Sequence, residues 1–309
     1  MKKNYFLVFL FIILILNFSC KKPDIIPAYL ILLDEDFKDC IDVTNYNNTH
    51  EQNYDEKELA AIKQQNFRDV LVSLNGTMLG YFPLPCTIPL LPNYSGRNNI
   101  RVIPCVRTPN TSTTTLPYHF VTPVEQFFEM EKEGEYRLSD FKLKYMPSVD
   151  FPVLETFKQS TAFSPRLPAY PTKIEISYDE ELDKDIGKIA LVDSATYFDV
   201  VTSYFPLLGR GERQFWEISY KSINGQMTTY LNFEKNISGI TVQPMMVYPS
   251  TQGVWKKTYI DITDIVMQAS SIAPQVSVRL QITGIREKES LDSYFYFENI
   301  KLITMNAPY

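Results

Sequence analysis

Histidine and cysteine, which often carry catalysis and metal binding, are scarce in this sequence. The 309 residues include two histidines and four cysteines, and neither histidine stands at ligand spacing from a pair of cysteines. His50 lies in a polar stretch and His119 in a Pro- and Thr-rich one, where we expect structural or solvated side chains and not the base of a nucleophilic triad. No phosphate-binding loop or glycine-rich dinucleotide motif is present. The sequence therefore predicts a protein that is not an enzyme.

A basic excess is also missing. The chain carries 30 Lys and Arg against 36 Asp and Glu, a formal charge of -6. This balance would not attract the phosphates of DNA or RNA, so nucleic-acid binding is disfavoured. The densest acidic run, at residues 179–185, is more typical of a solvated loop than of the paired carboxylates of a glycosidase.

A long hydrophobic run occurs at the start of the chain. The positive segment Met1–Asn4 precedes an uninterrupted apolar run at residues 5–16. That run is shorter than the roughly 20 residues that a helix needs to cross a bilayer. The pattern is typical of a secretory signal peptide, which we place at residues 1–19. Its removal leaves 28 basic and 36 acidic residues, a formal charge of -8.

Cys20 ends this leader in the sequence Asn-Phe-Ser-Cys, which resembles the lipobox of bacterial lipoproteins. The resemblance implies that Cys20 carries a diacylglyceryl group, with residues 20–27 as a tether to the membrane; the bulky Phe18 departs from the pattern. An uncleaved signal anchor with a free Cys20 is the alternative. Surface-exported lipoproteins of Bacteroidota tend to carry acidic residues after the cysteine, whereas Lys21 and Lys22 follow here. We therefore expect an outer-membrane lipoprotein that faces the periplasm.

The other three cysteines, Cys40, Cys86 and Cys105, are an odd number for an oxidising compartment. Residues 85–91 and 99–106 have the pattern of two strands around a turn, and a symmetric hairpin would place Cys86 opposite Cys105. A disulfide between these two is one interpretation. Two buried thiols that pack as small hydrophobic residues are the other.

Strand-forming residues are common, since Tyr and Phe number 20 each, while Pro numbers 20 and Gly only 11. Asn75-Gly76 stands between two alternating runs within residues 67–85, which is the strongest short signal for a β-hairpin. We expect an all-β protein in which a small β-sandwich is followed by a larger jelly-roll β-sandwich.

The small sandwich should cover residues 28–146. Residues 34–66 are polar and rich in asparagine, so we expect a long flexible insertion there, with a helical turn at 56–64. The hairpin is followed by two more apolar runs, Ile-Pro-Leu-Leu at 88–91 and Ile-Arg-Val at 100–102. Together they resemble the PEGA-like and carboxypeptidase-regulatory-like small β-sandwiches.

The second half, residues 147–309, is a succession of short strand patterns separated by turn residues. Segments at this spacing are typical of a β-sandwich. The expected strands are 173–178, 189–191, 197–201, 213–222, 227–233, 241–247, 256–262, 275–284 and 293–303.

Three aromatic segments of this half, which begin at Phe215, Trp255 and Tyr294, resemble the galactose-binding-like jelly rolls used as carbohydrate-binding modules. The resemblance covers roughly residues 151–305 and implies a role in binding. The two-part arrangement with its lipidated start also resembles a group of Bacteroidota lipoproteins that have no assigned activity.

Two smaller sites follow from resemblance. Jelly rolls of this kind often hold a structural Ca2+, to which Glu155 and Glu298 would contribute oxygens; no other cofactor is expected. The triplet that contains Ser194, Asp-Ser-Ala, resembles the O-glycosylation motif of exported Bacteroidota proteins, and a plain turn is the alternative.

Ligand contacts are expected from aromatic and arginine side chains in loops, because a flat ring stacks on the apolar face of a sugar while charged groups hold its hydroxyls. A place in the core is the alternative for each aromatic residue. Alternation predicts that Trp216, Ile218 and Tyr220 share one face and lie in the core. The candidate ligand residues, chosen by loop position, are Tyr204, Arg210, Arg213, Tyr248 and Trp255.

Two functions follow from these patterns. The first is a membrane-anchored, non-catalytic lipoprotein whose two β-sandwiches bind an envelope protein or scaffold an assembly. The second is a glycan-binding module of the cell envelope, which the jelly-roll resemblance and the aromatic loops favour. No sequence feature supports a glycosidase or a protease.

Overall fold

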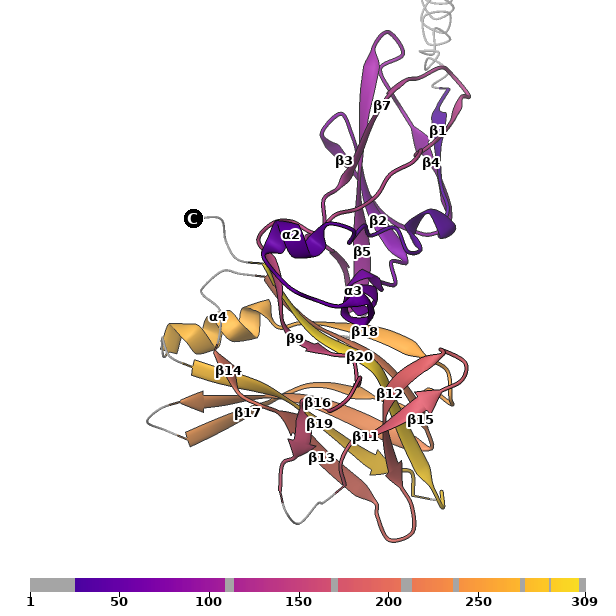
Figure 1. Cartoon of the computed structure of the whole chain (residues 1–309). Coiled ribbons are helices and arrows are strands. Elements are labelled where there is room, and N and C mark those ends of the chain that lie inside the picture. Colours follow the sequence, from indigo (N-terminus) through magenta and orange to yellow (C-terminus); the bar gives the residue numbers. More distant parts are fainter. Residues whose placement is uncertain are drawn as a thin grey trace, which may run out of the picture.

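The chain folds into two β-rich domains, the first at the top of Figure 1 and the second below it. The computed structural model describes residues 26–108, 114–167, 172–206, 213–235, 239–272, 276–288 and 290–305. The all-β class is confirmed, because antiparallel sheets make up most of both domains. No helix within these ranges is long and apolar enough to span a membrane. Cys20 and Arg210, two of the expected site residues, lie outside the described residues.

The first domain is a small sandwich of two sheets around one core. Its strands are β1 (Ala28–Leu32), β2 (Asp69–Leu74), β3 (Thr77–Pro83), β4 (Cys86–Leu90), β5 (Arg97–Thr108), β6 (Thr114–Pro117), β7 (Val124–Glu129) and β8 (Glu135–Arg137). One sheet has the order β4-β1-β8, and the other has the order β3-β2-β5-β6 with β7 also paired to β5. Leu30 of one sheet and Val72 of the other belong to the same buried cluster, so the two sheets share a core.

The hairpin expected at Asn75-Gly76 is confirmed as the turn between β2 and β3. Asn75 and Gly76 have φ angles of 51° and 79°, in the left-handed region that Asn tolerates and Gly enters freely. The turn sets a register in which Val70 and Val72 face the core and are fully buried.

The hairpin expected to place Cys86 opposite Cys105 is wrong. β4 pairs with β1, so that Cys86 lies opposite Leu32 in one sheet. β5 pairs with β2, which places Cys105 opposite Asp69 in the other sheet. Cys40, Cys86 and Cys105 are all free thiols. Cys40 and Cys105 are buried, and desolvation raises the pKa of each thiol to about 12, as expected for cysteines that pack as small hydrophobic residues.

The polar segment 34–66 is not the flexible insertion that its composition predicts. It forms η1 (Glu35–Phe37), α2 (Tyr46–His50) and α3 (Glu56–Lys63), the last close to the expected helical turn. Each of these elements buries one large apolar side chain in the first core, namely Phe37, Tyr46 and Ile62. A few well-placed apolar side chains therefore hold a segment whose average composition is polar.

In its described residues, the second domain is a sandwich of two six-stranded sheets with one helix, α4 (Thr263–Ile272). What we call the outer sheet contains β10 (Phe163–Pro165), β13 (Tyr197–Thr202), β14 (Phe205–Pro206), β16 (Gly225–Lys235), β17 (Gly239–Tyr248) and β19 (Val276–Arg286). What we call the joint sheet contains β9 (Val149–Glu155), β11 (Glu175–Asp179), β12 (Lys184–Leu191), β15 (Arg213–Ile223), β18 (Lys256–Asp261) and β20 (Ser293–Met305). Their orders are β10-β13-β19-β16-β17, with β14 on β19, and β11-β12-β20-β15-β18, with β9 on β20.

The core of the second domain lies between these two sheets. Trp216, Ile218 and Tyr220 point into it, as the alternation of their strand predicts, and Trp216 is fully buried. Phe198 of the outer sheet meets Phe295 of the joint sheet edge to face, with ring centroids 4.9 Å apart.

The two domains meet through the surface of the joint sheet that faces away from this core. Phe215, Tyr259 and Ile303 of the joint sheet belong to the buried cluster of the first domain. Phe120 of the first domain contacts the ring of Phe215 edge to face, with centroids 5.2 Å apart. The core of the first domain therefore continues into the second.

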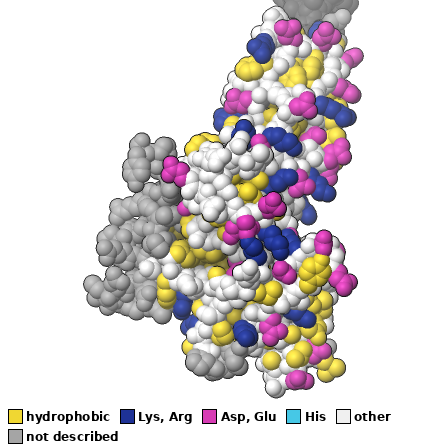
Figure 2. Space-filling model, viewed as in Figure 1, with side chains coloured by type: hydrophobic (Ala, Val, Ile, Leu, Met, Phe, Trp, Pro, Cys, Tyr) yellow, Lys and Arg dark blue, Asp and Glu magenta, His cyan; other side chains and the backbone are white. Residues whose placement is uncertain are grey.

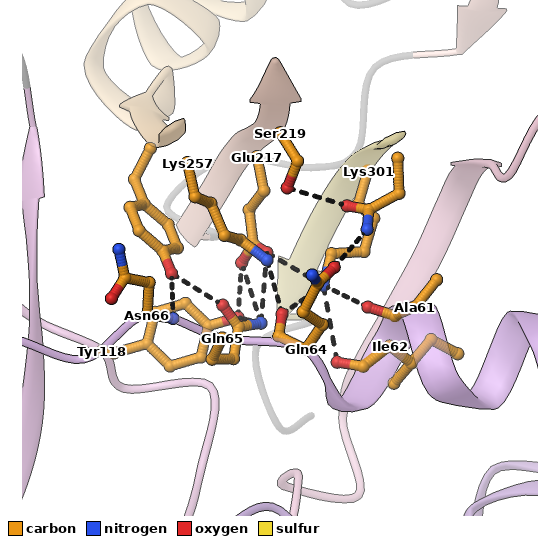
Figure 3. A network of polar contacts seen from close by, with 12 residues as sticks. Ala61, Ile62, Gln64, Gln65, Asn66, Tyr118, Glu217, Ser219, Lys257 and Lys301 are labelled. Carbon is orange, nitrogen blue, oxygen red and sulfur yellow. Dashed lines mark hydrogen bonds and ion pairs between the residues drawn. The ribbon is translucent and has the colours of Figure 1, made fainter. Parts of the chain in front are cut away.

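A buried polar network crosses the same joint (Figure 3). Glu217 is fully buried, and its carboxylate lies 3.0 Å from Nζ of Lys301 and 3.4 Å from Nζ of Lys257. Tyr118 donates a hydrogen bond of 2.5 Å to this carboxylate, and Lys301 donates one of 2.8 Å to the carbonyl oxygen of Ala61. A buried ion pair is tolerable only when further hydrogen bonds satisfy its remaining groups. Here those partners come from both domains.

Candidate functional site

Two of the candidate ligand residues, Tyr248 and Arg213, differ in exposure to solvent. Tyr248 is only 3% exposed, and its ring packs against that of Tyr220 with centroids 5.3 Å apart. Tyr248 is therefore a core residue, and the expectation that it contacts ligand is wrong. Arg213 is exposed at the start of β15, opposite Met305 of β20.

Trp255 lies half-buried beside the joint sheet. Nζ of Lys221 lies 4.7 Å from the ring centre of Trp255 and 5.1 Å from that of Tyr296, and it also pairs with Asp179 at 3.0 Å. The ammonium group of Lys221 thus occupies one face of the indole in a cation–π contact. A sugar therefore cannot stack on that face of Trp255. Trp255 also lines a cavity at the joint.

Tyr204 lies beside the outer sheet, where the guanidinium carbon of Arg279 is 4.5 Å from its ring centre. Arg279 points away from the core, because its neighbours Val278 and Leu280 point into it. The same alternation directs side chains of three adjacent strands outward, on the surface that we call the polar face. Its members are Tyr197, Asp199, Thr228, Tyr230, Asn232, Arg279, Gln281 and Thr283. The outer sheet is the lower layer of Figure 1, remote from the first domain.

A row of hydrogen bonds crosses the polar face from strand to strand. Asn232 of β16 donates to Gln281 of β19 at 2.8 Å, and Gln281 donates to Asp199 of β13 at 2.7 Å. Arg166, just after β10, ends the row with an ion pair of 3.2 Å to Asp199. The three side chains of the row are buried, and these bonds offset the cost of burying them and hold each amide in one orientation.

Three polar atoms on or beside this row are shielded from solvent and have no hydrogen-bond partner among the described residues. They are Oδ1 of Asn232, Nε of Arg279 and Oη of Tyr204. Each unsatisfied group of this kind costs about 1–3 kcal/mol, and buried polar groups in folded proteins are nearly always bonded. Asn232 is fully buried, whereas Arg279 and Tyr204 are half-buried, so the last two are the groups that could turn toward a ligand.

Two half-buried tyrosines, Tyr197 of β13 and Tyr230 of β16, lie on the same face. Desolvation and, after it, the charge of Asp199 raise the pKa of Tyr197 to about 12, so its hydroxyl stays neutral at physiological pH. Aromatic rings beside oriented polar groups match a sugar, whose ring has apolar faces and a rim of hydroxyls.

Glu155 and Glu298, the expected calcium ligands, have other partners. Glu155 accepts a hydrogen bond of 2.6 Å from the backbone N–H of Phe157, and Glu298 pairs with Lys184 and accepts 2.7 Å from Gln64. In the part of the chain that the structure describes, no group of three or more His, Cys, Asp and Glu side chains could hold a metal ion.

The remaining candidates occupy turns and the first core. Ser194 is exposed in the turn between β12 and β13, which fits the turn interpretation, and its glycosylation stays a prediction. The ring nitrogens of His50 lie 3.0 Å from the carbonyl oxygens of Tyr46 and Met146, and the ring stacks on that of Tyr46. His50 thus has a structural place. Asp179 and Asp185, from the acidic run, pair with Lys221 and Lys57.

The polar face is the site that sequence reasoning missed. Asp199, Asn232 and Gln281 lie within strands, whereas the candidates were sought in loops. A signal was present, because Asp199 stands between Phe198 and Val200 in a run that is otherwise suited to burial. Alternation indicates that such a residue faces outward, but it does not indicate which three strands are neighbours.

No family model matches the chain, and no curated protein matches it. Among solved structures it is similar to carbohydrate-binding modules. A xylanase of Clostridium thermocellum, containing a family 22 module and a catalytic module in complex with xylohexaose, is 12% identical with a TM-score of 0.38, over 51% of this chain and 29% of that one. The chain thus spans less than a third of that structure.

Two further structures are isolated modules. A carbohydrate-binding module of the β-sandwich superfamily, described as promiscuous in specificity, is 9% identical with a TM-score of 0.35, over 77% of this chain and 85% of that one. A family 28 module specific for non-crystalline cellulose is 13% identical with a TM-score of 0.33, over 50% of this chain and 92% of that one. At these identities the likeness concerns the β-sandwich fold alone.

Proposed function

We propose that this protein is a non-catalytic glycan-binding protein and that its sugar site is the polar face of the outer sheet. The observation that carries the proposal is the hydrogen-bonded row of Asp199, Gln281 and Asn232, beside which buried polar atoms remain without a partner. A sugar hydroxyl both donates and accepts. Arg279 and Tyr204 are half-buried, so a shift of their side chains would bring Nε of Arg279 and Oη of Tyr204 to the hydroxyls of a sugar, whereas Asn232 stays buried.

The cellular setting that we propose is the envelope. The leader at residues 1–19 and the lipidation expected at Cys20 would hold the protein at the outer membrane, with the periplasmic side favoured by Lys21 and Lys22. Glycan binding in that setting would fix the protein to a cell-wall or surface polymer.

A protein partner is the second candidate, and an edge strand favours it. β3 lies at the edge of its sheet, and Met78 and Tyr81 on it are 65% and 48% exposed. Exposed edge strands with apolar side chains pair readily with other chains. In this alternative the protein scaffolds an envelope assembly through its first domain.

The Tyr204→Phe variant tests the sugar site, because it removes one unpartnered hydroxyl and keeps the ring. Stability should be unchanged or slightly higher, since the hydroxyl makes no hydrogen bond within the described protein. Affinity for a glycan found on an array should fall roughly three- to tenfold, as expected for one neutral hydrogen bond. Calorimetric titration measures the affinity, and Tyr81→Phe, an exposed tyrosine of the first domain, is the matched control.

A pull-down from solubilised envelopes beside the array separates the two candidates. A sugar signal that Tyr204→Phe weakens and Tyr81→Phe does not supports the polar face. A stable protein partner with no sugar signal would contradict glycan binding and favour the scaffold.

A further inference from the structure

A cavity of about 250 Å3 lies at the joint between the domains, where the chain after α3 meets β18. Its charged lining has a single sign, because Arg68, Arg107, Lys256 and Lys257 line it and no Asp or Glu does. Over the face shown in Figure 2, by contrast, basic and acidic side chains are interspersed. The chain as a whole has a formal charge of -6, so tertiary structure and not composition makes this cavity positive.

Two of the four charges are neutralised from behind the cavity wall. The guanidinium of Arg107 makes two hydrogen bonds, of 2.5 and 2.8 Å, to the carboxylate of Asp69. Lys257 lies 3.4 Å from Glu217, a carboxylate that it shares with Lys301. The cavity wall is therefore not uniformly available to an anion.

The other two charges face the cavity without a counter-charge. Arg68 and Lys256 are exposed, and neither has an ion pair within the described ranges. The contact of Arg68 is a long hydrogen bond, 3.4 Å from its Nε to Oδ1 of Asn66. An excess of two positive charges in one small cavity favours a negatively charged ligand.

The charged groups that line the cavity are all hydrogen-bond donors. Nε1 of Trp255 is shielded from solvent and has no partner in the described structure. An indole N–H, a guanidinium and an ammonium group donate hydrogen bonds and do not accept them. A ligand must therefore offer acceptors, and a carboxylate matches both the charge and the forked geometry of an arginine.

A second cavity of about 550 Å3 continues from the first. The two share Asn66, Arg68 and Arg107, and the larger one extends to Lys38 and Asp34. The pair of volumes is in the range of small-ligand sites, roughly 300–1,000 Å3. A ligand longer than one unit would therefore extend past Arg68 from one cavity into the other.

We propose that the joint cavity binds a carboxylate-bearing sugar, as a unit of an acidic glycan, with Arg68 and Lys256 on the carboxylate and Trp255 in the wall. The preference for an anion rests on the cavity alone, whereas the choice of a sugar rests on the proposed function. The site is separate from the polar face, because its lining comes from the first domain and the joint sheet and not from the outer sheet.

Proton uptake by Lys257 would give a second way to detect binding at this site. Desolvation and the neighbouring ammonium of Lys301 lower the pKa of Lys257 to about 7, against the opposing charges of Glu217 and Glu298. Its Nζ also donates to the carbonyl oxygen of Gln64 and lies 5.7 Å from the ring centre of Tyr259. An anion in the cavity would raise this pKa again, so binding above pH 7 should draw a proton from the buffer.

The test is calorimetric titration of the full chain with an oligogalacturonate and with a neutral galacto-oligosaccharide. We expect binding of the acidic sugar that weakens with salt, and proton uptake at pH 7.5 seen by comparing two buffers of different ionisation enthalpy. Arg68→Ala and Lys256→Ala should each reduce the affinity about tenfold, as expected for a hydrogen bond to a charged group. Both side chains are exposed, so these variants should fold normally.

The controls separate this proposal from the sugar site on the polar face. Arg101→Ala removes an exposed arginine on β5, far from the cavity lining, and should leave the affinity for the acidic sugar unchanged. Tyr204→Phe should also leave it unchanged. Absence of binding to the acidic sugar, equal binding of the neutral one, or full affinity in Arg68→Ala would overturn the proposal. Loss of binding in Tyr204→Phe with no change in Arg68→Ala would instead place an acidic sugar on the polar face.

Discussion

At the scale of single residues, Glu217 shows how a buried charge is accommodated in this protein. Burial by itself would raise the pKa of Glu217, but Lys301 and Lys257 outweigh it and the pKa lies below its ordinary value. Two ammonium groups thus face one carboxylate at the joint. The pKa of Lys257 is lowered to about 7, because burial disfavours its charged form and the ammonium of Lys301 repels it.

This imbalance predicts a dependence of stability on pH. With a folded pKa of about 7 against an ordinary 10.5, Lys257 binds fewer protons in the folded chain than in the unfolded chain between these values. Its contribution to the free energy of unfolding is therefore least favourable below pH 7 and improves as the pH rises. From pH 7 to 9 the wild type should gain roughly 2 kcal/mol relative to Lys257→Met.

Urea unfolding of both proteins at pH 7 and pH 9 measures this difference. Lys132→Met, which removes an exposed lysine of the first domain, should follow the wild type. Parallel pH profiles for the wild type and Lys257→Met would show that Lys257 keeps its ordinary pKa in the joint.

At the scale of elements, α3 connects a polar segment to the centre of the joint. Asp55 caps the helix by accepting from the backbone N–H groups of Lys57 and Glu58, and Glu58 in turn accepts from the N–H of Asp55. At the other end of α3, the carbonyl oxygens of Ala61 and Ile62 accept hydrogen bonds from Lys301. The N-terminal end of this short helix is thus capped, and its C-terminal end contacts the joint.

Asp55→Ala should lower the free energy of unfolding by about 1 kcal/mol, because an N-terminal cap of this kind contributes that amount. The exposed pair of Asp55 with Lys158 adds little to this effect. Urea unfolding measures it, and Glu131→Ala, an exposed acid outside the helix, is the control. An unchanged unfolding midpoint in Asp55→Ala would mean that packing of Ile62, and not the cap, holds α3.

At the scale of the whole molecule, β1 begins at the end of the first domain that is remote from the second domain (Figure 1). Five residues lie between Cys20 and residue 26, so this connection of six residue steps spans at most about 20 Å. An anchor at Cys20 would hold the first domain near the membrane and leave the polar face of the second domain farthest from it. That orientation suits a protein that captures a polymer away from the bilayer.

The proposed anchor predicts how the protein divides between the membrane fraction and the soluble fraction. Cys20→Ala should move the protein from the membrane fraction to the soluble fraction, because lipidation requires the thiol. Cys86→Ala, which removes a half-buried free thiol instead, should stay in the membrane fraction. Fractionation followed by immunoblotting measures both, and a Cys20→Ala protein that remains with the membrane would support the uncleaved signal anchor.

Most strands of the second domain, and the direction of their side chains, could be predicted from the sequence alone. Alternation placed Trp216, Ile218 and Tyr220 in the core, and Asn75-Gly76 set a hairpin, because both signals depend on neighbours within a few residues. The short strand patterns of the second half correspond closely to β11–β13 and β15–β20. The helix α4, between β18 and β19, was not expected.

Tertiary structure decided which strands became neighbours, and with them every candidate site. Cys86 and Cys105 lie in different sheets, although a local pattern favoured one hairpin. Asp199, Asn232 and Gln281 form one row only because β13, β19 and β16 are adjacent, and the joint cavity is lined by residues as far apart in the chain as Arg68 and Trp255. Contacts of this kind join residues far apart in the chain, and local propensity carries no information about them, because it is set within a few residues.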